Sequence, residues 1–356
     1  MLSAPCPDTI VKALQKNCPL DYTILRDIQD IVSISMEWDG LLARSRCNRA
    51  FSCSKWYLAT PYILPELKPL VIVARRHRTL AGIFPLWLNI SRKEAGFPDD
   101  YSDHPDIIVA DDDMEAITGL LSTALQDASD YSQLLLKHIK PDSNCVRAAQ
   151  KLGLCPDVNQ VFAPESSMPY AVLDLKCGYE EYLRKLGRKF RLNLNRMRSK
   201  AQQNDVVVRE LSPKDLSPES LPELFLALHE SRFGQNTSLK TVCKSPAPWI
   251  HHLFPYLFAE RRMRVFAVLQ KGRIAGLDLT MVTGSGLYGF NGGFVPEIAC
   301  YDPGKLLIDK TIQQCCMEGL SEYDIGWFGQ KYKAHWKPVI RYISGLVFET
   351  RSSVVM

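Results

Sequence analysis

The sequence predicts an α/β protein of two tandem domains, residues 1–165 and 166–356, each with a mixed sheet flanked by helices. In both halves, segments with the two-residue period of a strand alternate with segments of helical period, which is typical of α/β folds. A hairpin pattern occurs twice, about half a chain apart, as expected after duplication of one α/β unit. The 356 residues are sufficient for two domains of ordinary size, each with its own core.

The first half carries the elements that this fold requires. Residues 69–74 and 80–87 are apolar runs joined by a polar turn, a pattern typical of a hairpin of two buried strands. Before this hairpin, helical spacing predicts a helix with one apolar face, formed by Ile31, Ile34, Trp38, Leu41 and Leu42. The other expected elements are two strands, a helix, a strand and a short helix, at residues 21–26, 107–110, 111–127, 131–138 and 143–153.

The second half repeats this organisation after a linker at residues 164–168. Its hairpin is expected at residues 265–269 and 274–281. A strand, a basic helix and two further helices are predicted before it, at residues 170–175, 184–200, 218–233 and 249–260.

The stretch after the second hairpin predicts a strand, a helix and a strand, with a candidate anion site between the first two. The strand at residues 288–294 contains aromatic residues and three glycines, which permit close approach of another molecule. A helix begins near Pro303, and a second strand follows at residues 323–328. The free amides and the dipole of a helix N-terminus attract phosphate. We therefore expect a phosphate-bearing ligand here, bound by Asn291, Pro303, Gly304, Lys305 and Leu306.

Composition excludes several classes of function. Apolar residues make up 46% and charged residues 23% of the chain, as in a soluble globular protein, and no apolar run approaches the ~20 residues of a membrane span. A net charge of +4 is slight for this length and gives no general argument for nucleic-acid binding. The 11 cysteines form no Cys-x-x-Cys pair and no zinc-like spacing. We expect reduced thiols, no metal and a cytoplasmic location, since residues 1–8 also lack the features of a secretion signal.

Six short motifs, in this order and spacing, resemble the CelD/BcsL-like (BioF-like) branch of the GNAT acyltransferase superfamily, which is related to the Fem-type aminoacyltransferases. They are Tyr179-Glu-Glu-Tyr-Leu-Arg-Lys-Leu, Arg188-Lys-Phe-Arg-Leu-Asn-Leu-Asn-Arg, Asp302-Pro-Gly-Lys-Leu-Leu, Glu318-Gly319, Tyr323-Asp-Ile-Gly and Gly329-Gln-Lys-Tyr-Lys. The resemblance covers about residues 170–340. The superfamily's glycine-rich pyrophosphate loop, Arg/Gln-x-x-Gly-x-Gly/Ala, is absent, and Pro303-Gly304-Lys305 stands in its place.

The resemblance implies two GNAT-like domains, with the acyl donor bound by the C-terminal domain and the acceptor on the side of the N-terminal one. The implied reaction moves an acyl group from a thioester to an amine of a small molecule or sugar precursor. The donor would be acyl-CoA, acting as co-substrate, or an acyl carrier protein. Two alternatives stay open: a Fem-like transferase that uses aminoacyl-tRNA, and a degenerate transferase that binds an anionic partner without chemistry.

The basic helix at residues 184–200 has two interpretations. It carries many lysines and arginines and no acid, and its apolar residues give it a packing side, so it can be a solvated helix face. The alternative is an electropositive rim for a nucleotide-sugar, a carrier-protein helix, a phosphopantetheine or a tRNA acceptor end. Arg188 and Arg191 are the candidate substrate-binding residues, because they fall within a motif that resembles the family.

Two carboxylates are candidates for accepting a proton from an amine. Asp103 lies in a polar, loop-like run with Tyr101, and the alternative there is an exposed acidic loop. Asp278 interrupts an apolar strand, where a carboxylate must be hydrogen-bonded or face an opening. We treat Asp103 and Asp278 as candidate catalytic residues and Tyr101 as a candidate substrate contact.

The densest titratable cluster follows the last predicted strand of the motif region and consists of Lys331, Tyr332, Lys333 and His335. Acyl transfer from a thioester requires donors for the oxyanion and an acid for the departing thiolate. Superfamily members often use a tyrosine as that acid, so the resemblance implies Tyr332 in this role, with Lys333 neutralising charge. Lys331 and His335 are candidate substrate contacts. The alternative is a group of surface residues after a strand.

Overall fold

The computed structural model describes residues 19–47, 49–98, 103–110, 112–126, 129–154, 158–234 and 247–350. The chain divides into two compact units, of which unit 1 is Met1–Cys47, Glu66–Val158 and Gly345–Met356, and unit 2 is Asn48–Pro65 and Asn159–Ser344. The chain passes from unit 1 to unit 2 between Val158 and Asn159, and the two domains expected at residues 1–165 and 166–356 stay a prediction. Each unit also takes in one segment from elsewhere in the chain.

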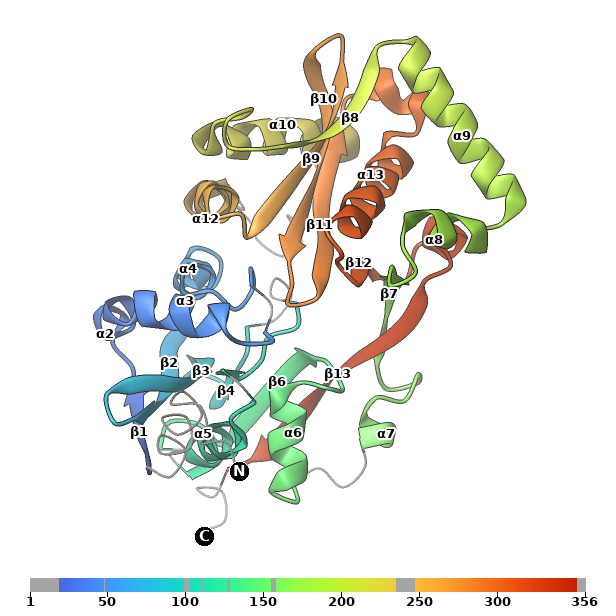
Figure 1. Cartoon of the computed structure of the whole chain (residues 1–356). Helices are drawn as coiled ribbons and strands as arrows, with labels where there is room; N and C mark the ends of the chain where they lie inside the picture. The colour runs from blue at the N-terminus through green and yellow to red at the C-terminus, as the bar shows by residue number, and fades with distance from the viewer. Residues whose placement is uncertain are drawn as a thin grey trace, which may run out of the picture. The chain divides into compact units, whose positions relative to one another are not determined.

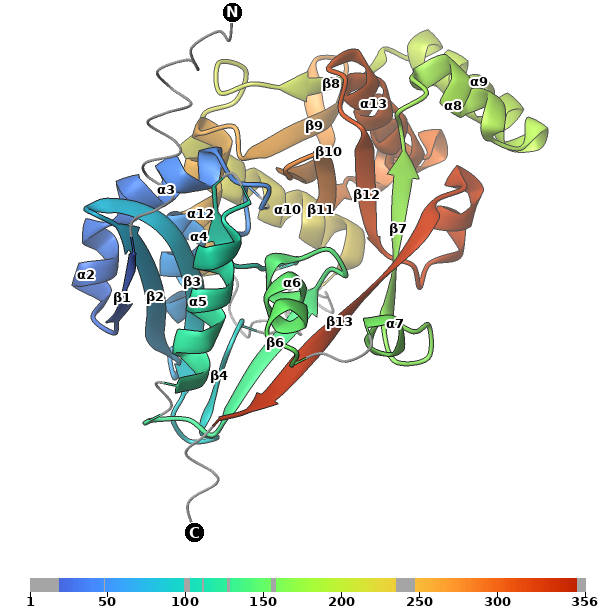
Figure 2. The ribbon, with the colours of Figure 1, turned by 60° about the horizontal axis from the view of Figure 1, so that its bottom comes forward.

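Unit 1 contains a mixed sheet in the order β1-β2-β3-β4-β6-β13, with β5 paired to β3. The strands are β1 (Leu20–Leu25), β2 (Lys68–Arg76), β3 (Thr79–Asn89), β4 (Glu94–Gly96), β5 (Ile108–Val109), β6 (Gln133–Ile139) and the last part of β13 (Val339–Glu349). β4 and β6 are parallel, whereas β1, β2 and β3 form antiparallel pairs. The predicted first hairpin is confirmed as β2–β3. β13 runs beside β6 in both Figure 1 and Figure 2.

The helices of unit 1 are α2 (Ile28–Ser33), α3 (Ser35–Ala43), α5 (Met114–Gln126) and α6 (Asn144–Lys151). The helix predicted around residues 31–42 is divided, because Ile34 leaves the helical region with ψ near 3°. Its apolar face is nevertheless buried as expected, through Ile31, Trp38, Leu41 and Leu42.

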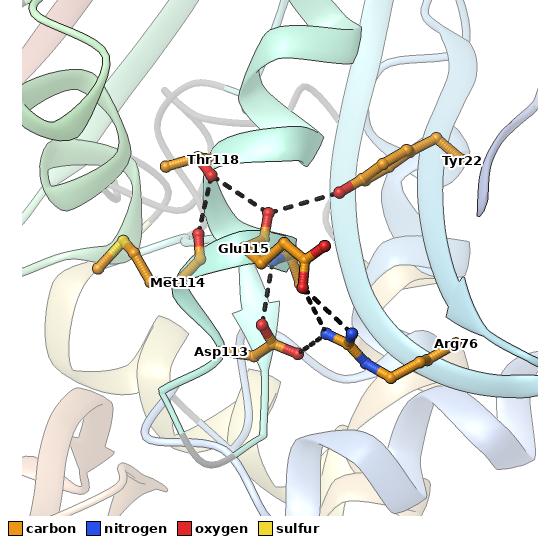
Figure 3. Close-up of polar contacts among 7 residues, drawn as sticks. Tyr22, Arg76, Asp113, Met114, Glu115 and Thr118 are labelled. Atoms are coloured by element: carbon orange, nitrogen blue, oxygen red, sulfur yellow. Dashed lines mark hydrogen bonds and ion pairs between the residues drawn. The ribbon is translucent and has the colours of Figure 1, made fainter. Parts of the chain in front are cut away.

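A polar network fixes the start of α5 to two strands of unit 1, as Figure 3 shows. The buried guanidinium of Arg76 donates to Asp113 at 2.8 Å and to Glu115 at 3.1 Å. Tyr22 donates its hydroxyl to the carbonyl of Glu115 at 3.4 Å. Two carboxylates at the N-terminal end of a helix also suit the helix dipole.

Unit 2 contains a second mixed sheet in the order β13-β7-β12-β11-β10-β9-β8. The strands are β7 (Met168–Asp174), β8 (Val206–Leu211), β9 (Met263–Gln270), β10 (Arg273–Val282), β11 (Gly286–Phe294), β12 (Glu322–Trp327) and the first part of β13. β11 and β12 are parallel and joined by α13, and the pairs of β10 with β9 and β11 are antiparallel. The predicted second hairpin, β9–β10, and the predicted strand-helix-strand, β11-α13-β12, are both confirmed.

Helices cover both faces of this second sheet. The helices outside unit 1 are α4 (Ser54–Ala59), α7 (Val158–Val161), α8 (Tyr179–Lys185), α9 (Arg188–Gln203), α10 (Leu221–Phe233), α12 (Ala247–Ala259) and α13 (Pro303–Met317). Short 3₁₀ turns are η1 (Thr60–Tyr62), η2 (Pro218–Ser220), η3 (Pro296–Tyr301) and η4 (Lys331–Trp336). In Figure 1, α10 and α12 lie on one side of β9, β10 and β11, and α13 lies on the other. The helix predicted at residues 184–200 is two helices, because the backbone is extended at Leu186 and Gly187.

Gly293 of β11 allows α10 to lie directly against the strand. A Cβ at this position would be 2.3 Å from the backbone carbonyl group of Leu228 in α10, which no side chain can occupy. The close approach brings the last turn of α10, with Arg232, to the end of β11. None of the helices in the described ranges combines the length and the apolar character that a membrane span requires.

Candidate active site

The parallel strands β11 and β12 are paired over only part of their length. Their register runs from Gly286 and Glu322 to Tyr288 and Asp324 and then ends, although β11 continues to Phe294. On the other side of β11, the pairing with β10 shifts between Leu279 and Thr280, which marks a β-bulge. Beyond these points β11 presents a backbone edge that is not paired with β12. We name the region after Tyr288 and Asp324 the strand divergence.

A carboxylate, an arginine and two tyrosines lie near enough beside the strand divergence to influence one another electrostatically. Asp278 of β10 stands opposite Gly292 of β11 and accepts a hydrogen bond from the hydroxyl of Tyr323. Burial raises the pKa of Asp278 to about 7, although the charge of Arg232 and the Tyr323 hydrogen bond oppose this. Tyr332 is 43% exposed, and the burial of the rest of its side chain raises its pKa, to which the nearby Asp278 charge adds. We name Asp278, Tyr323, Tyr332 and Arg232 the carboxylate cluster.

A buried lysine lies at the same divergence. The Nζ of Lys333 donates to the backbone carbonyl of Trp327 at 2.8 Å, and burial lowers the pKa of this amine to about 8, against the charge of Asp324. Gly326 leaves room in front of it, with φ of 79°. A Cβ on Gly326 would be 3.7 Å from the Nζ of Lys333 and 3.6 Å from the hydroxyl of Tyr288.

The two groups flank the divergence from opposite faces of the sheet. Tyr323 belongs to the carboxylate cluster, and Asp324, the next residue of β12, faces Lys333. Consecutive strand side chains point to opposite faces. The same alternation occurs on β11, where a Cβ on Gly289 would be 3.1 Å from the Tyr323 hydroxyl while Tyr288 faces the other group. A chain-like ligand lying in the divergence would therefore meet a carboxylate on one side and an ammonium on the other.

The first turn of α13 lies at the far end of β11, after η3. Asp302 precedes the helix with φ of 54°, and its carbonyl accepts the amides of Lys305 at 3.0 Å and Leu306 at 3.3 Å. Pro303 has no amide hydrogen, so Gly304 carries the remaining amide of this turn. No atom lies within 4 Å of a Cβ built on Gly304, and the Lys305 ammonium forms an ion pair with the Asp302 carboxylate.

The other sequence-predicted residues are distributed more widely. Asn291 turns toward α10, where it is hydrogen-bonded to His229 and accepts the Gly292 amide at 2.8 Å. Arg188 is exposed at the start of α9, and Arg191 donates to the Arg184 carbonyl at 3.2 Å.

On η4, His335 is stacked on Phe190 of α9, with ring centroids 5.6 Å apart, and Lys331 is exposed. Asp103 lies in unit 1, before β5, and Tyr101 lies outside the described residues. Nothing in the described ranges groups three or more metal-ligating side chains. The structure thus brings together Asp278, Tyr332 and, from the opposite face, Lys333.

Arg232 and Tyr323 belong to the carboxylate cluster, and sequence reasoning did not select them. Arg232 occurs in the last turn of a helix whose other face is apolar. A basic residue is common there because it suits the helix dipole, so the sequence gives no sign of a functional role. Tyr323 occupies a strand position that fits a buried aromatic residue, and it is 1% exposed. A polar atom on such a residue requires a partner, and this requirement is the signal that could have identified it.

Comparisons with known proteins concern the fold of the chain. Residues 188–334, which lie within unit 2, match the family model described as Acetyltransferase (GNAT) domain. Among solved structures, FemX is 12% identical with a TM-score of 0.61, over 93% of this chain and 98% of that one. L-PGS from Bacillus licheniformis is 13% identical with a TM-score of 0.55, over 90% and 92% of the two chains.

The C-terminal domain (DUF2156) of a putative lysylphosphatidylglycerol synthetase from Agrobacterium fabrum is also 13% identical, with a TM-score of 0.52 over 90% and 92%. At these identities the likeness shows the fold alone. A search of curated proteins gave no match.

Proposed function

We propose that unit 2 transfers an acyl group from a thioester donor to an amine of a small molecule or sugar precursor. We further propose that the chain is a relative of the CelD/BcsL-like branch of the GNAT superfamily. The observation that carries the proposal is the strand divergence, flanked by Asp278 and Tyr332 on one face and Lys333 on the other. This arrangement supplies a proton acceptor, a proton donor and a cation around one unpaired strand edge.

The reaction uses these groups without a covalent intermediate. The amine nitrogen attacks the thioester carbonyl carbon, and the carbon–sulfur bond breaks as the tetrahedral intermediate collapses. Asp278 takes the proton that the attacking nitrogen loses, because a pKa of about 7 suits a base at neutral pH. Tyr332 gives a proton to the departing thiolate, and the ammonium of Lys333 stabilises negative charge on the reacting oxygen or sulfur.

The donor's arm would lie along β11, with its phosphate at Gly304 and Lys305 and with Pro303 and Leu306 shaping the turn. Acyl-CoA and an acyl carrier protein both present such an arm. Arg188, Arg191, Lys331 and His335 are proposed acceptor or donor contacts, and Asp103 and Tyr101 are proposed acceptor-side residues. We place the reaction in the cytoplasm, and the free thiols of the cysteines in the described ranges support this.

A Fem-like reaction with aminoacyl-tRNA is the second candidate. The basic residues of α8 and α9 favour it, as does the fold that the chain shares with FemX. A degenerate protein that binds an anionic partner without chemistry is the third, for which the missing glycine-rich loop is the supporting feature.

The test compares purified protein with acetyl-CoA, acyl carrier protein loaded with acetyl groups, and aminoacylated tRNA, each with a panel of amines. Thiol release measures transfer from the first two. Tyr332→Phe keeps the ring and removes the acid, so turnover should fall about 10²–10⁴-fold with little change in donor affinity. Tyr342→Phe, on β13, is the matched control and should keep the wild-type rate. Ribonuclease-sensitive transfer without thioester turnover would instead support the Fem-like reaction, and donor binding without any turnover would support the degenerate protein.

A further inference from the structure

One face of α8 and α9 is strongly basic and lacks acidic partners along α9. Its exposed members, which we name the α8–α9 basic surface, are Arg184, Lys185, Arg188, Lys189, Arg196 and Lys200. Another arginine of α9, Arg198, is neutralised by Asp309 of α13 at 2.6 Å and leaves this set. Arg184 forms an ion pair at 2.6 Å with Glu181, which also belongs to α8. Because α9 itself contains no acidic residue, the basic surface presents several cationic side chains to solvent.

An apolar residue stands in the middle of this surface. Leu192 is 59% exposed and lies one helical turn from Arg188 on one side and from Arg196 on the other. A leucine flanked by arginines is complementary to a helix that carries an apolar residue flanked by acids. An RNA backbone would gain nothing from such a leucine, because its affinity comes from phosphate neutralisation and base stacking.

The basic surface continues into a cavity that reaches the start of α13. The cavity has a volume of about 790 Å³ and is lined by Arg196 and Lys200 of α9 and by Cys300 and Asp302 of the segment before α13. Lys200 donates to the Cys300 carbonyl at 3.1 Å and holds the two walls together. A partner on α9 would therefore lie beside the turn that carries Gly304.

The first turn of α13 offers few groups that could bind a phosphate. The carbonyl of Asp302 occupies two of its amides, Pro303 has none, and the Lys305 ammonium is paired with Asp302. The remaining amide is that of Gly304, a residue whose Cβ, if one were added, would meet open space. CoA carries a pyrophosphate and a further ribose phosphate, whereas the arm of a carrier protein is attached through a single phosphodiester.

We infer that the donor is an acyl thioester on a small acidic carrier protein, whose acidic helix docks on the α8–α9 basic surface. The single phosphodiester of the arm then lies at Gly304, and the arm continues along β11 to the strand divergence. This inference rests on the proposed function, because it names the carrier of the thioester used there. The transfer step is unchanged: a carbon–nitrogen bond forms, a carbon–sulfur bond breaks, and the carrier leaves as its free thiol.

The experiment measures thiol release with the same acyl group, acetyl or octanoyl, on a purified acyl carrier protein and on CoA. The wild type should show a lower KM for the carrier form, and added salt should raise that KM. The double variant Lys189→Glu and Arg196→Glu should raise KM for the carrier form about 10–100-fold, with KM for acyl-CoA unchanged. Lys214→Glu with Arg273→Glu applies the same change of charge to two exposed residues elsewhere in unit 2 and should alter neither value. Leu192→Ser should weaken the carrier form alone.

Other results would overturn the inference in distinguishable ways. Acyl-CoA turnover without carrier turnover, or a double variant that affects both donors equally, rejects the docking surface and leaves the proposed function standing. Absence of turnover with either thioester rejects the proposed function itself. If the double variant instead abolishes ribonuclease-sensitive transfer from aminoacylated tRNA, the basic surface is an RNA site. Equal thermal unfolding temperatures of the variants and the wild type exclude misfolding as the cause.

Discussion

Replacing Asp278 by asparagine should stabilise the protein while removing its activity. The pKa of this carboxyl is raised from 3.8 to about 7 in the folded protein. At about 1.4 kcal/mol for each pH unit, holding the ionised form costs about 4 kcal/mol at most once the pH exceeds 7. Asparagine has nearly the same shape and no charge, so Asp278→Asn avoids this cost.

The dependence on pH has a definite sign. The folded protein retains a proton on Asp278 that the unfolded chain releases above pH ~4, so wild-type stability falls as pH rises toward 7 and is then level. The stability difference, variant minus wild type, should grow by about 1.4 kcal/mol per pH unit between pH ~5 and ~7 and remain constant above pH ~8.

Urea unfolding at four pH values, followed by tryptophan fluorescence, measures this difference. Asp174→Asn, an exposed aspartate on β7, is the control and should show no such growth. In the transfer assay Asp278→Asn should reduce turnover about 10²–10⁴-fold. A stability difference that does not change with pH would show that Asp278 titrates near its ordinary value, and the argument for it as a base would be lost.

Two further predictions concern the surroundings of the site. The wild type should gain stability as pH rises from about 8 toward 10.5, because the buried ammonium of Lys333 is costly until it loses its proton, and Lys333→Met should abolish this gain. Denaturation across that pH range measures the effect, with exposed Lys214→Met as the control. Gly293→Ala should destabilise the protein by about 1–3 kcal/mol, since the new methyl group would overlap the Leu228 carbonyl. Gly304→Ala, where a Cβ meets open space, should be nearly neutral in the same assay.

Much of the fold could be predicted because the decisive signals are local. The hairpin β9–β10 has a polar turn between two apolar runs, and β11, α13 and β12 are separated by a proline, glycines and changes of period. Errors occurred where one residue interrupts a continuing pattern. The periodicity of residues 184–200 passes through Gly187, whose extended backbone ends one helix and begins another.

The site was only partly predictable, for a different physical reason. Asp278 is a candidate because a carboxylate in an apolar strand needs an explanation, and Tyr332 and Lys333 are candidates because they cluster in sequence. Their environment depends on contacts between distant segments. The register of β10 with β11 and the approach of α10 over Gly293 bring Arg232 to Asp278, and no local pattern contains that information.

The shared strand β13 has a consequence for how the protein is made. Residues 345–349 lie beside β6 in unit 1, where Gln133 donates to Glu349 at 2.8 Å although the two are 216 residues apart in the chain. Proteins generally fold from the N-terminus as they leave the ribosome, but the sheet of unit 1 stays open at β6 until the last strand has been synthesised. An open edge of this kind pairs readily with other chains, so a nascent or shortened chain that stops before residue 345 should aggregate through β6.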